Sequence, residues 1–60
     1  MEVGQRVQKV DCPRLVFEVK EERDINGLPH YLVARIDWPE DRRIFSQHTL
    51  LDKRYFKSVH

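Results

Sequence analysis

Apolar and polar side chains alternate most clearly in two segments of this chain, residues 14–22 and residues 30–38. In the first segment Leu15, Phe17 and Val19 stand at every second position and alternate with Val16, Glu18 and Lys20. A period of two is typical of a half-buried strand, and the β-branched and aromatic side chains of both segments favour the same structure. We therefore predict a strand in each segment.

The stretch between these segments, residues 23–29, contains the pair Asn26-Gly27. This pair is the strongest short-range signal for a chain reversal at positive φ. It predicts an antiparallel hairpin with a somewhat long tip. The alternation also predicts which side chains share the buried face, because successive side chains of a strand point to opposite faces. On this pattern they are Leu15, Phe17, Val19, Leu32, Ala34 and Ile36.

A weaker strand is expected before the hairpin, over residues 4–10. Val7 and Val10 are three positions apart, whereas strict alternation requires an even number. A bulge or a bend near Gln8 would reconcile this spacing. Gly4 suits a turn or kink at the start of the strand, because glycine readily adopts positive φ.

After the hairpin, Trp-Pro-Glu-Asp at positions 38–41 has the composition of a tight turn. A short strand over residues 42–46, a helical or 3₁₀ turn over residues 48–52 and a strand over residues 55–59 would follow. With the segments above, this gives an all-β domain of five strands, with a 3₁₀ turn before the last one.

A second interpretation begins a helix at Asp37, with Glu40 completing a capping box and Pro39 in the first turn. The apolar stripe of that helix would run through Ile44 and Leu51. Residues 39–56 would then be helical, and the fold would be a three-stranded antiparallel sheet plus a C-terminal helix. Weak helix formers such as Ser46, His48 and Thr49 in the middle favour the five-stranded alternative.

Sixty residues allow one small domain, residues 1–60, with a single core. Cys12 is the only cysteine, so the domain has no internal disulfide, and this usage fits a reducing compartment. The longest apolar run is far shorter than the roughly 20 residues that span a bilayer, and the first residues do not resemble a secretory signal. We expect a cytoplasmic protein without membrane contact.

The charge is unevenly distributed along the chain. Residues 1–41 hold six basic and nine acidic side chains, whereas residues 42–60 hold five basic and one acidic. Cations interleaved with aromatic rings are typical of nucleic-acid surfaces. Nucleic-acid binding through this end of the chain is therefore the alternative function, with Arg42, Arg43, Lys53, Arg54 and Lys57 as its candidate residues.

The five-strand layout resembles small SH3-like barrels, including the Tudor and KOW types. Val3-Gly4-Gln5-Arg6-Val7 is similar to their "x-G-x-x-V" first strand, and Phe45-Ser46 followed by Leu50-Leu51 is similar to their fourth strand and 3₁₀ turn. This resemblance implies a binding surface built from loops and exposed aromatic residues. The residues we expect to bind a partner are Tyr31, Trp38 and Pro39.

Catalytic and metal chemistry have little support in this sequence. Cys12 lacks a recognisable base, and its spacing from His30, His48 and His60 matches no zinc motif. Two glycines cannot form a glycine-rich phosphate loop. We expect no enzyme, no cofactor and no metal, but a small interaction module that binds a protein partner or itself.

Overall fold

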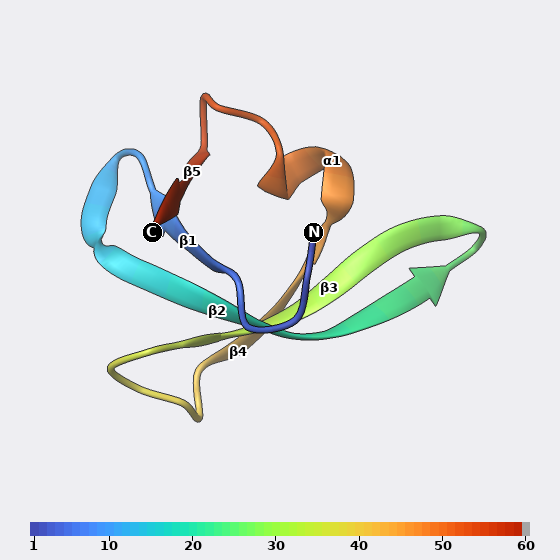
Figure 1. Ribbon diagram of the computed structural model, residues 1–60, viewed down its shortest axis with the longest axis horizontal. Helices are drawn as coiled ribbons and strands as arrows, with labels where there is room; N and C mark the ends of the chain where they lie inside the picture. Colours follow the sequence, from blue (N-terminus) through green and yellow to red (C-terminus); the bar gives the residue numbers. More distant parts are fainter. Residues whose placement is uncertain (60) are drawn as a thin grey trace.

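The computed structural model describes residues 1–59 and consists of five strands and one helical turn (Figure 1). All pairings between neighbouring strands are antiparallel, and the strands form one sheet in the order β4-β3-β2-β1-β5. The protein is therefore an all-β domain, and residues 39–56 do not form the continuous helix of the second interpretation. The elements are β1 (Arg6–Lys9), β2 (Cys12–Ile25), β3 (Leu28–Arg35), β4 (Arg42–Ser46), α1 (Gln47–Leu50) and β5 (Phe56–Val59).

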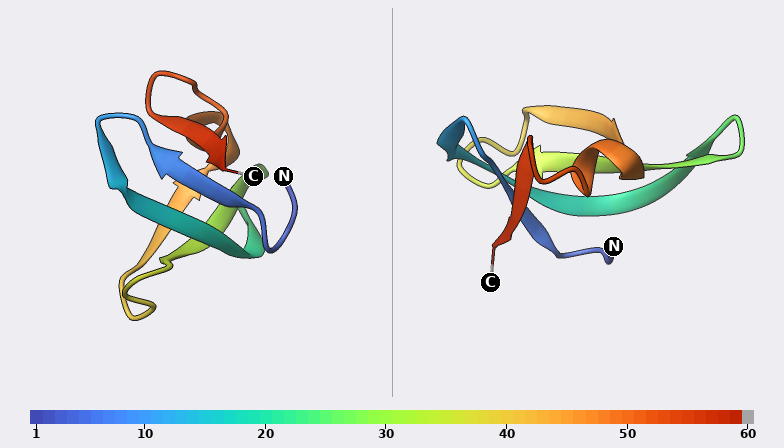
Figure 2. Two further views of the ribbon diagram at one scale, coloured as in Figure 1. Left: turned by 60° about the vertical axis from the view of Figure 1, so that its left-hand side comes forward. Right: turned by 90° about the horizontal axis from the view of Figure 1, so that it is seen from above.

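The sheet bends around a single core, with α1 and β5 facing the inner side of β2 and β3 (Figure 2). Phe17 contributes a fully buried ring, which meets Phe45 and Phe56 edge-on at centroid distances of 6.0 and 6.4 Å. Such edge-to-face pairs add to the stabilisation from burial. The buried cluster consists of Val7, Phe17, Val19, Tyr31, Val33, Leu50 and Phe56.

The prediction for the core face of β3 is wrong. Tyr31 and Val33 point into the core, whereas Leu32 is only partly buried and Ile36 is 44% exposed. Ala34 is buried, but it lies outside the core cluster. The odd-numbered residues of β3 thus face inward, together with Phe17 and Val19 of β2.

A bulge at Lys20 explains this difference. From the turn outward, Ile25 pairs with Leu28 and Glu21 with Leu32, a register in which odd residues oppose even ones. The register shifts between Val19 and Glu21, so that Val19 pairs with Val33. One extra residue in one strand reverses the inward face of everything beyond it.

The hairpin tip is also shorter than predicted, since only Asn26 and Gly27 separate the strands. Both have positive φ, 54° and 80°, as a two-residue turn of this kind requires. β3 ends at Arg35 instead of reaching Trp38. The register of β1 does shift between Gln8 and Lys9, but the extra residues lie in β2, because Gln8 pairs with Val16 and Lys9 with Cys12. Val10 is 44% exposed, so it does not join Val7 in the core.

The link between β4 and β5 begins with one α-helical turn rather than a 3₁₀ turn. Ser46 caps it, because its hydroxyl accepts a hydrogen bond from the Thr49 amide at 3.1 Å. Leu50 of this turn reaches the core. No helix in residues 1–59 has the length and apolar character needed to cross a bilayer.

Candidate interaction surface

The connection between β3 and β4 is a tight turn over residues 38–41. The Asp41 amide donates to the Trp38 carbonyl at 2.9 Å, and the Arg35 amide donates to the Asp41 carbonyl at 3.1 Å. Pro39 fits the second position of such a turn because its ring fixes φ. The turn leaves the Trp38 side chain 55% exposed, although an indole is among the most costly side chains to leave in water.

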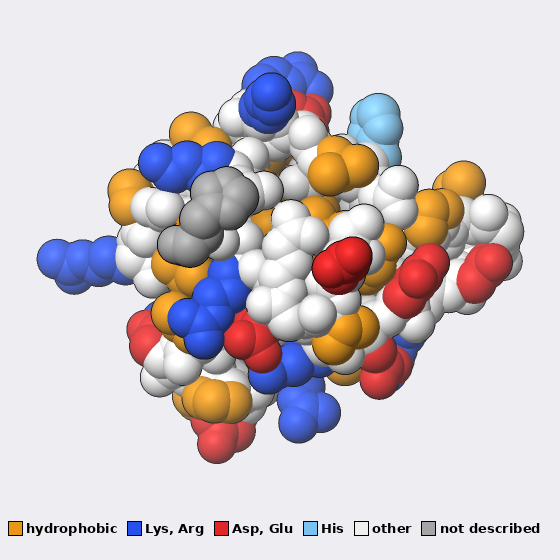
Figure 3. Space-filling view, viewed as in Figure 1, with side chains coloured by type: hydrophobic (Ala, Val, Ile, Leu, Met, Phe, Trp, Pro, Cys, Tyr) orange, Lys and Arg blue, Asp and Glu red, His pale blue; other side chains and the backbone are white. Residues whose placement is uncertain are grey.

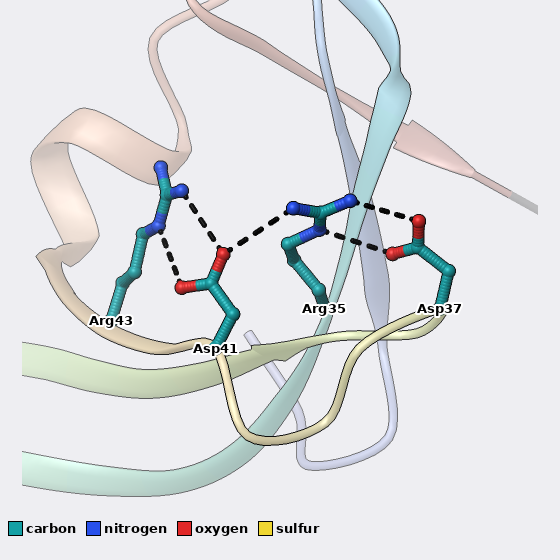
Figure 4. Close-up of polar contacts among 4 residues, drawn as sticks. All are labelled: Arg35, Asp37, Asp41 and Arg43. Carbon is teal, nitrogen blue, oxygen red and sulfur yellow. Dashed lines mark hydrogen bonds and ion pairs between the residues drawn. The ribbon is translucent and has the colours of Figure 1, made fainter.

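Side chains of alternating charge hold this turn in place (Figure 4). Arg35 donates two hydrogen bonds to Asp37, at 3.1 and 2.9 Å, and Arg43 donates two to Asp41, at 3.2 and 3.1 Å. A further nitrogen of Arg35 lies 3.6 Å from an Asp41 oxygen and so joins the two pairs. We call these four residues the turn ladder.

The turn ladder keeps its carboxylates charged. Hydrogen bonds from Arg35 lower the pKa of Asp37, and hydrogen bonds from Arg43, with a smaller contribution from Arg35, lower the pKa of Asp41. The same contacts, above all those with Asp37, raise the pKa of Arg35. The Arg35 guanidinium also lies 5.7 Å from the centre of the Trp38 ring, within cation–π distance. The Trp38 ring is therefore exposed to solvent, while its position is held by the Arg35 guanidinium beside it.

The outer face of β3 continues from this turn. Residues that pair across an antiparallel sheet point to the same side, so the bulge places the even-numbered residues of β3 outward. Ile44 of β4 pairs with Leu32, and Ile25 of β2 pairs with Leu28, so both share this side. We call the following set the ribbon face: Ile25, Leu28, Leu32, Ala34, Ile36 and Ile44.

Two shallow hollows, of about 370 and 150 Å³, adjoin the ribbon face beside the turn and share Lys20, Ala34 and Pro39 in their walls. Their charged walls comprise four cations and two carboxylates, a net charge of +2: Arg6, Lys20, Arg35, Arg42, Glu18 and Glu21. We call this region the turn end of the ribbon face. Glu18 accepts from both Lys20 (2.7 Å) and Arg6 (3.2 Å), and these bonds lower its pKa.

A larger groove of about 500 Å³ lies at the opposite end of β3, between the hairpin and α1. Leu28 and Pro29 line one side, and His48 and Leu51 line the other. The only carboxylate in its walls, Asp52, is paired with Arg54 at 2.7 Å. The groove is therefore mostly apolar and carries little net charge.

The structure separates the three residues expected to bind a partner. Trp38 and Pro39 are exposed in the turn, but Tyr31 is only 3% exposed and belongs to the core. Its hydroxyl donates to the Gln47 side chain at 3.0 Å. Tyr31 is therefore a core residue, and its side chain is not on the surface that a partner would contact. The sequence prediction missed the exposed Ile36 and Ile44, because it assigned the even-numbered face of β3 to the core.

The five basic residues of the C-terminal part do not form one patch. Arg42 begins β4 beside the turn, whereas Lys53 and Arg54 lie in the loop before β5, at the opposite end of the molecule (Figure 1). Arg43 and Arg54 are paired with Asp41 and Asp52. Within residues 1–59, Arg42 has no carboxylate at ion-pair distance.

The described residues contain no group of three or more histidine, cysteine, aspartate or glutamate side chains able to hold a metal ion. One histidine considered in the sequence, His60, lies outside them. Cys12 is a free, partly exposed thiol.

No family model, curated protein or solved structure matches this chain. The class is therefore given by the structure itself, a five-stranded antiparallel all-β domain with an exposed tryptophan turn.

Proposed function

We propose that this domain is a non-catalytic interaction module, which binds a protein partner or a second copy through Trp38, Pro39 and the adjoining ribbon face. The observation that carries this proposal is the exposed Trp38 on a turn fixed by the turn ladder. Tryptophan is strongly enriched at binding hot spots, and a rigid support lowers the entropy cost of binding.

The charge state of the carboxylates supports a non-catalytic role. A general base works best with a pKa near the operating pH, which requires a raised carboxylate pKa. In this domain the pKa values of Glu18, Asp37 and Asp41 are all lowered by arginine or lysine partners. These side chains act as charged hydrogen-bond acceptors that hold strands and the turn together.

We also propose that the fold belongs with the SH3-like barrels and that the protein works in the cytoplasm. Five strands in one sheet, with one helical turn between the fourth and the last, support the first proposal. The single free cysteine supports the second. In SH3-like domains the loops provide the binding surface, and the Trp38 turn is a loop of this kind.

The test compares immobilised wild-type protein with the Trp38→Ala variant. Tyr55→Ala is the matched control, because Tyr55 is a comparably exposed aromatic residue in the loop before β5. We expect Trp38→Ala to lose the bound protein, whether an external partner or free copies of the domain, and Tyr55→Ala to keep it. If both variants retain all binding, the proposed surface is wrong.

Nucleic acid is the competing ligand in the same experiment. Titration with mixed-sequence DNA and RNA at low and moderate salt would reveal it by a steep salt dependence. A salt-dependent affinity that Arg42→Ala and Lys57→Ala reduce, and that Trp38→Ala leaves unchanged, would replace the protein-binding proposal.

A further inference from the structure

The two-residue turn at the tip of the hairpin holds Asn26, the only asparagine of the chain, followed by Gly27. The side chain of an asparagine is an amide, and its carbonyl carbon lies within reach of the backbone nitrogen of the next residue. Glycine has no Cβ to hinder that nitrogen, and the space beside Gly27 is open, since an added Cβ would meet no atom within 4 Å. The pair is therefore suited to attack of the Gly27 nitrogen on the Asn26 side chain.

The turn is fully accessible to water. It lies at the end of the hairpin arm, residues 21–29, which projects from the body of the domain and in which every residue is exposed (Figure 1). The arm holds three acidic side chains and one arginine, a net charge of −2. Figure 3 shows acidic and hydrophobic side chains side by side along this projection. A further negative charge at Asn26 would therefore be added to an arm that is already acidic.

Asp24 holds the nitrogen that would attack. The Gly27 amide donates a hydrogen bond to Oδ1 of Asp24 at 2.7 Å. Hydrogen bonds to a carboxylate are stronger than those between neutral groups. The nitrogen must lose its proton to become a nucleophile, and a carboxylate beside it disfavours a second negative charge. The contact with Asp24 therefore opposes the first step of the attack.

The geometry of the turn opposes the attack as well. Asn26 and Gly27 have φ values of 54° and 80°, as in a type I′ turn. In that turn type ψ of the first central residue is about 30°, which keeps the next nitrogen away from the side chain. Ring closure requires a rotation about the Cα–C bond of Asn26. This rotation breaks the pairing of Ile25 with Leu28, so the turn must open first.

We propose that Asn26 is a site of spontaneous deamidation and that Asp24 is the residue that slows it. The Gly27 nitrogen gives up its proton and forms a bond to Cγ of Asn26, while the bond from Cγ to the side-chain nitrogen breaks and ammonia leaves with that proton. The resulting succinimide takes up one water at either of its carbonyl carbons and opens to aspartate or isoaspartate. Water is the only co-reactant. This inference is independent of the proposed function.

The two products have different consequences for the arm. Aspartate keeps the backbone unchanged and tolerates positive φ, so it preserves the turn and changes the net charge of the arm from −2 to −3. Isoaspartate routes the main chain through the side-chain methylene, which adds one backbone atom to a two-residue turn. Such a turn no longer matches the twist of its strands. Ile25 and Leu28 flank it and lie on the ribbon face, so isoaspartate alters one end of that face.

The first test measures the release of ammonia and the change in mass of the full chain at neutral pH and physiological temperature. Asn26 is the only asparagine, so fragmentation of the product assigns the change to it and separates aspartate from isoaspartate. We expect the folded chain to react several-fold more slowly than the chain unfolded in urea. Equal rates would overturn the protection by the turn, and no reaction in urea would overturn the site itself.

Variants of the arm test the part played by Asp24. Asp24→Ala should deamidate several-fold faster than wild type when folded and at a similar rate in urea. Asp24→Ser should lie between them, because a hydroxyl accepts the same bond without the charge. The matched control is Glu22→Ala, which removes a carboxylate of the same arm and keeps the bond from Asp24 to Gly27. An unchanged or lower rate in Asp24→Ala would overturn its role.

Gly27→Ala separates the chemistry from simple loosening of the arm. The added methyl group hinders the nitrogen, so this variant should react more slowly than wild type, although its strained φ opens the turn more often. A faster reaction would mean that opening alone sets the rate, and would overturn the assignment to Asp24. Asn26→Asp serves as the standard for the aspartate product. It should keep the slow amide hydrogen exchange of the arm, and the isoaspartate product should lose it. Equal exchange in both would overturn the predicted loss of the turn.

Discussion

The guanidinium of Arg43 lies 5.2 Å from the centre of the fully buried Phe17 ring, while two of its nitrogens hold Asp41. Arg43 follows Arg42 at the start of β4, and it pairs in register with the buried Val33. One side chain therefore covers the end of the core and fixes the tryptophan turn. Core packing and turn geometry are coupled through this contact.

Arg43→Ala should destabilise the domain by about 0.5 to 1 kcal/mol through the loss of the cation–π contact alone. It should also loosen the turn, because Asp41 loses the two hydrogen bonds from Arg43. Urea unfolding measures the first effect, and the emission of Trp38, the sole tryptophan, reports the second. Arg42→Ala is the control, with no expected change in stability beyond about 0.5 kcal/mol.

Acid should weaken the loop before β5 over a defined range. Hydrogen bonds from the side chain and backbone amide of Arg54 lower the pKa of Asp52 from 3.8 to about 2. A lowered folded-state pKa stabilises the fold above pH 4, and this contribution is lost as the pH falls toward 2. The melting temperature of wild type should fall more steeply over that range than that of Asp52→Asn. Parallel pH profiles would contradict this assignment.

Tyr31→Phe should cost about 0.5 to 1.5 kcal/mol, the usual value of one hydrogen bond. The change removes the bond to Gln47 and keeps the ring in the core. Because Tyr31 is buried, binding of a protein partner or of a second copy should be unaffected while the variant is folded. Tyr55→Phe, at an exposed site, should change neither property. A specific loss of binding in Tyr31→Phe would restore Tyr31 as a site residue.

Gly27→Ala should destabilise the hairpin arm by about 1 to 2 kcal/mol. The cause is backbone strain at a φ of +80°, since there is open space for a methyl group. Asn26→Gly, at a φ of +54°, should be close to neutral because glycine tolerates this conformation. Amide hydrogen exchange in residues 21–29 would show faster local opening in the alanine variant only.

Strand positions could be predicted because alternation, Asn26-Gly27 and the Trp38-Pro39 turn are local signals. The inward face of β3 could not, because it depends on the bulge at Lys20, and both faces of β3 are apolar. A bulge depends on twist and packing, which no single strand encodes.

The turn ladder was predictable in part, because two of its contacts join residues that are close in the sequence. Arg35–Asp37 and Asp41–Arg43 are opposite charges two positions apart, a spacing that puts both on one side of an extended chain. That signal was available in the sequence. The contact between Arg35 and Asp41 joins the two pairs across the turn. It requires the folded turn and cannot be read from spacing.

The pairing of β1 with β5 has a consequence for how the chain reaches its native state. Strands β2, β3 and β4 join through short turns and form by local contacts, whereas Arg6 pairs with Val59 across almost the whole sequence. Closing so long a loop is the slow event in folding of small β domains. Phe56 arrives only with β5, so Phe17 and Phe45 stay uncovered until then. An intermediate lacking β5 would expose these rings, and this is the stage at which the chain is most prone to aggregate.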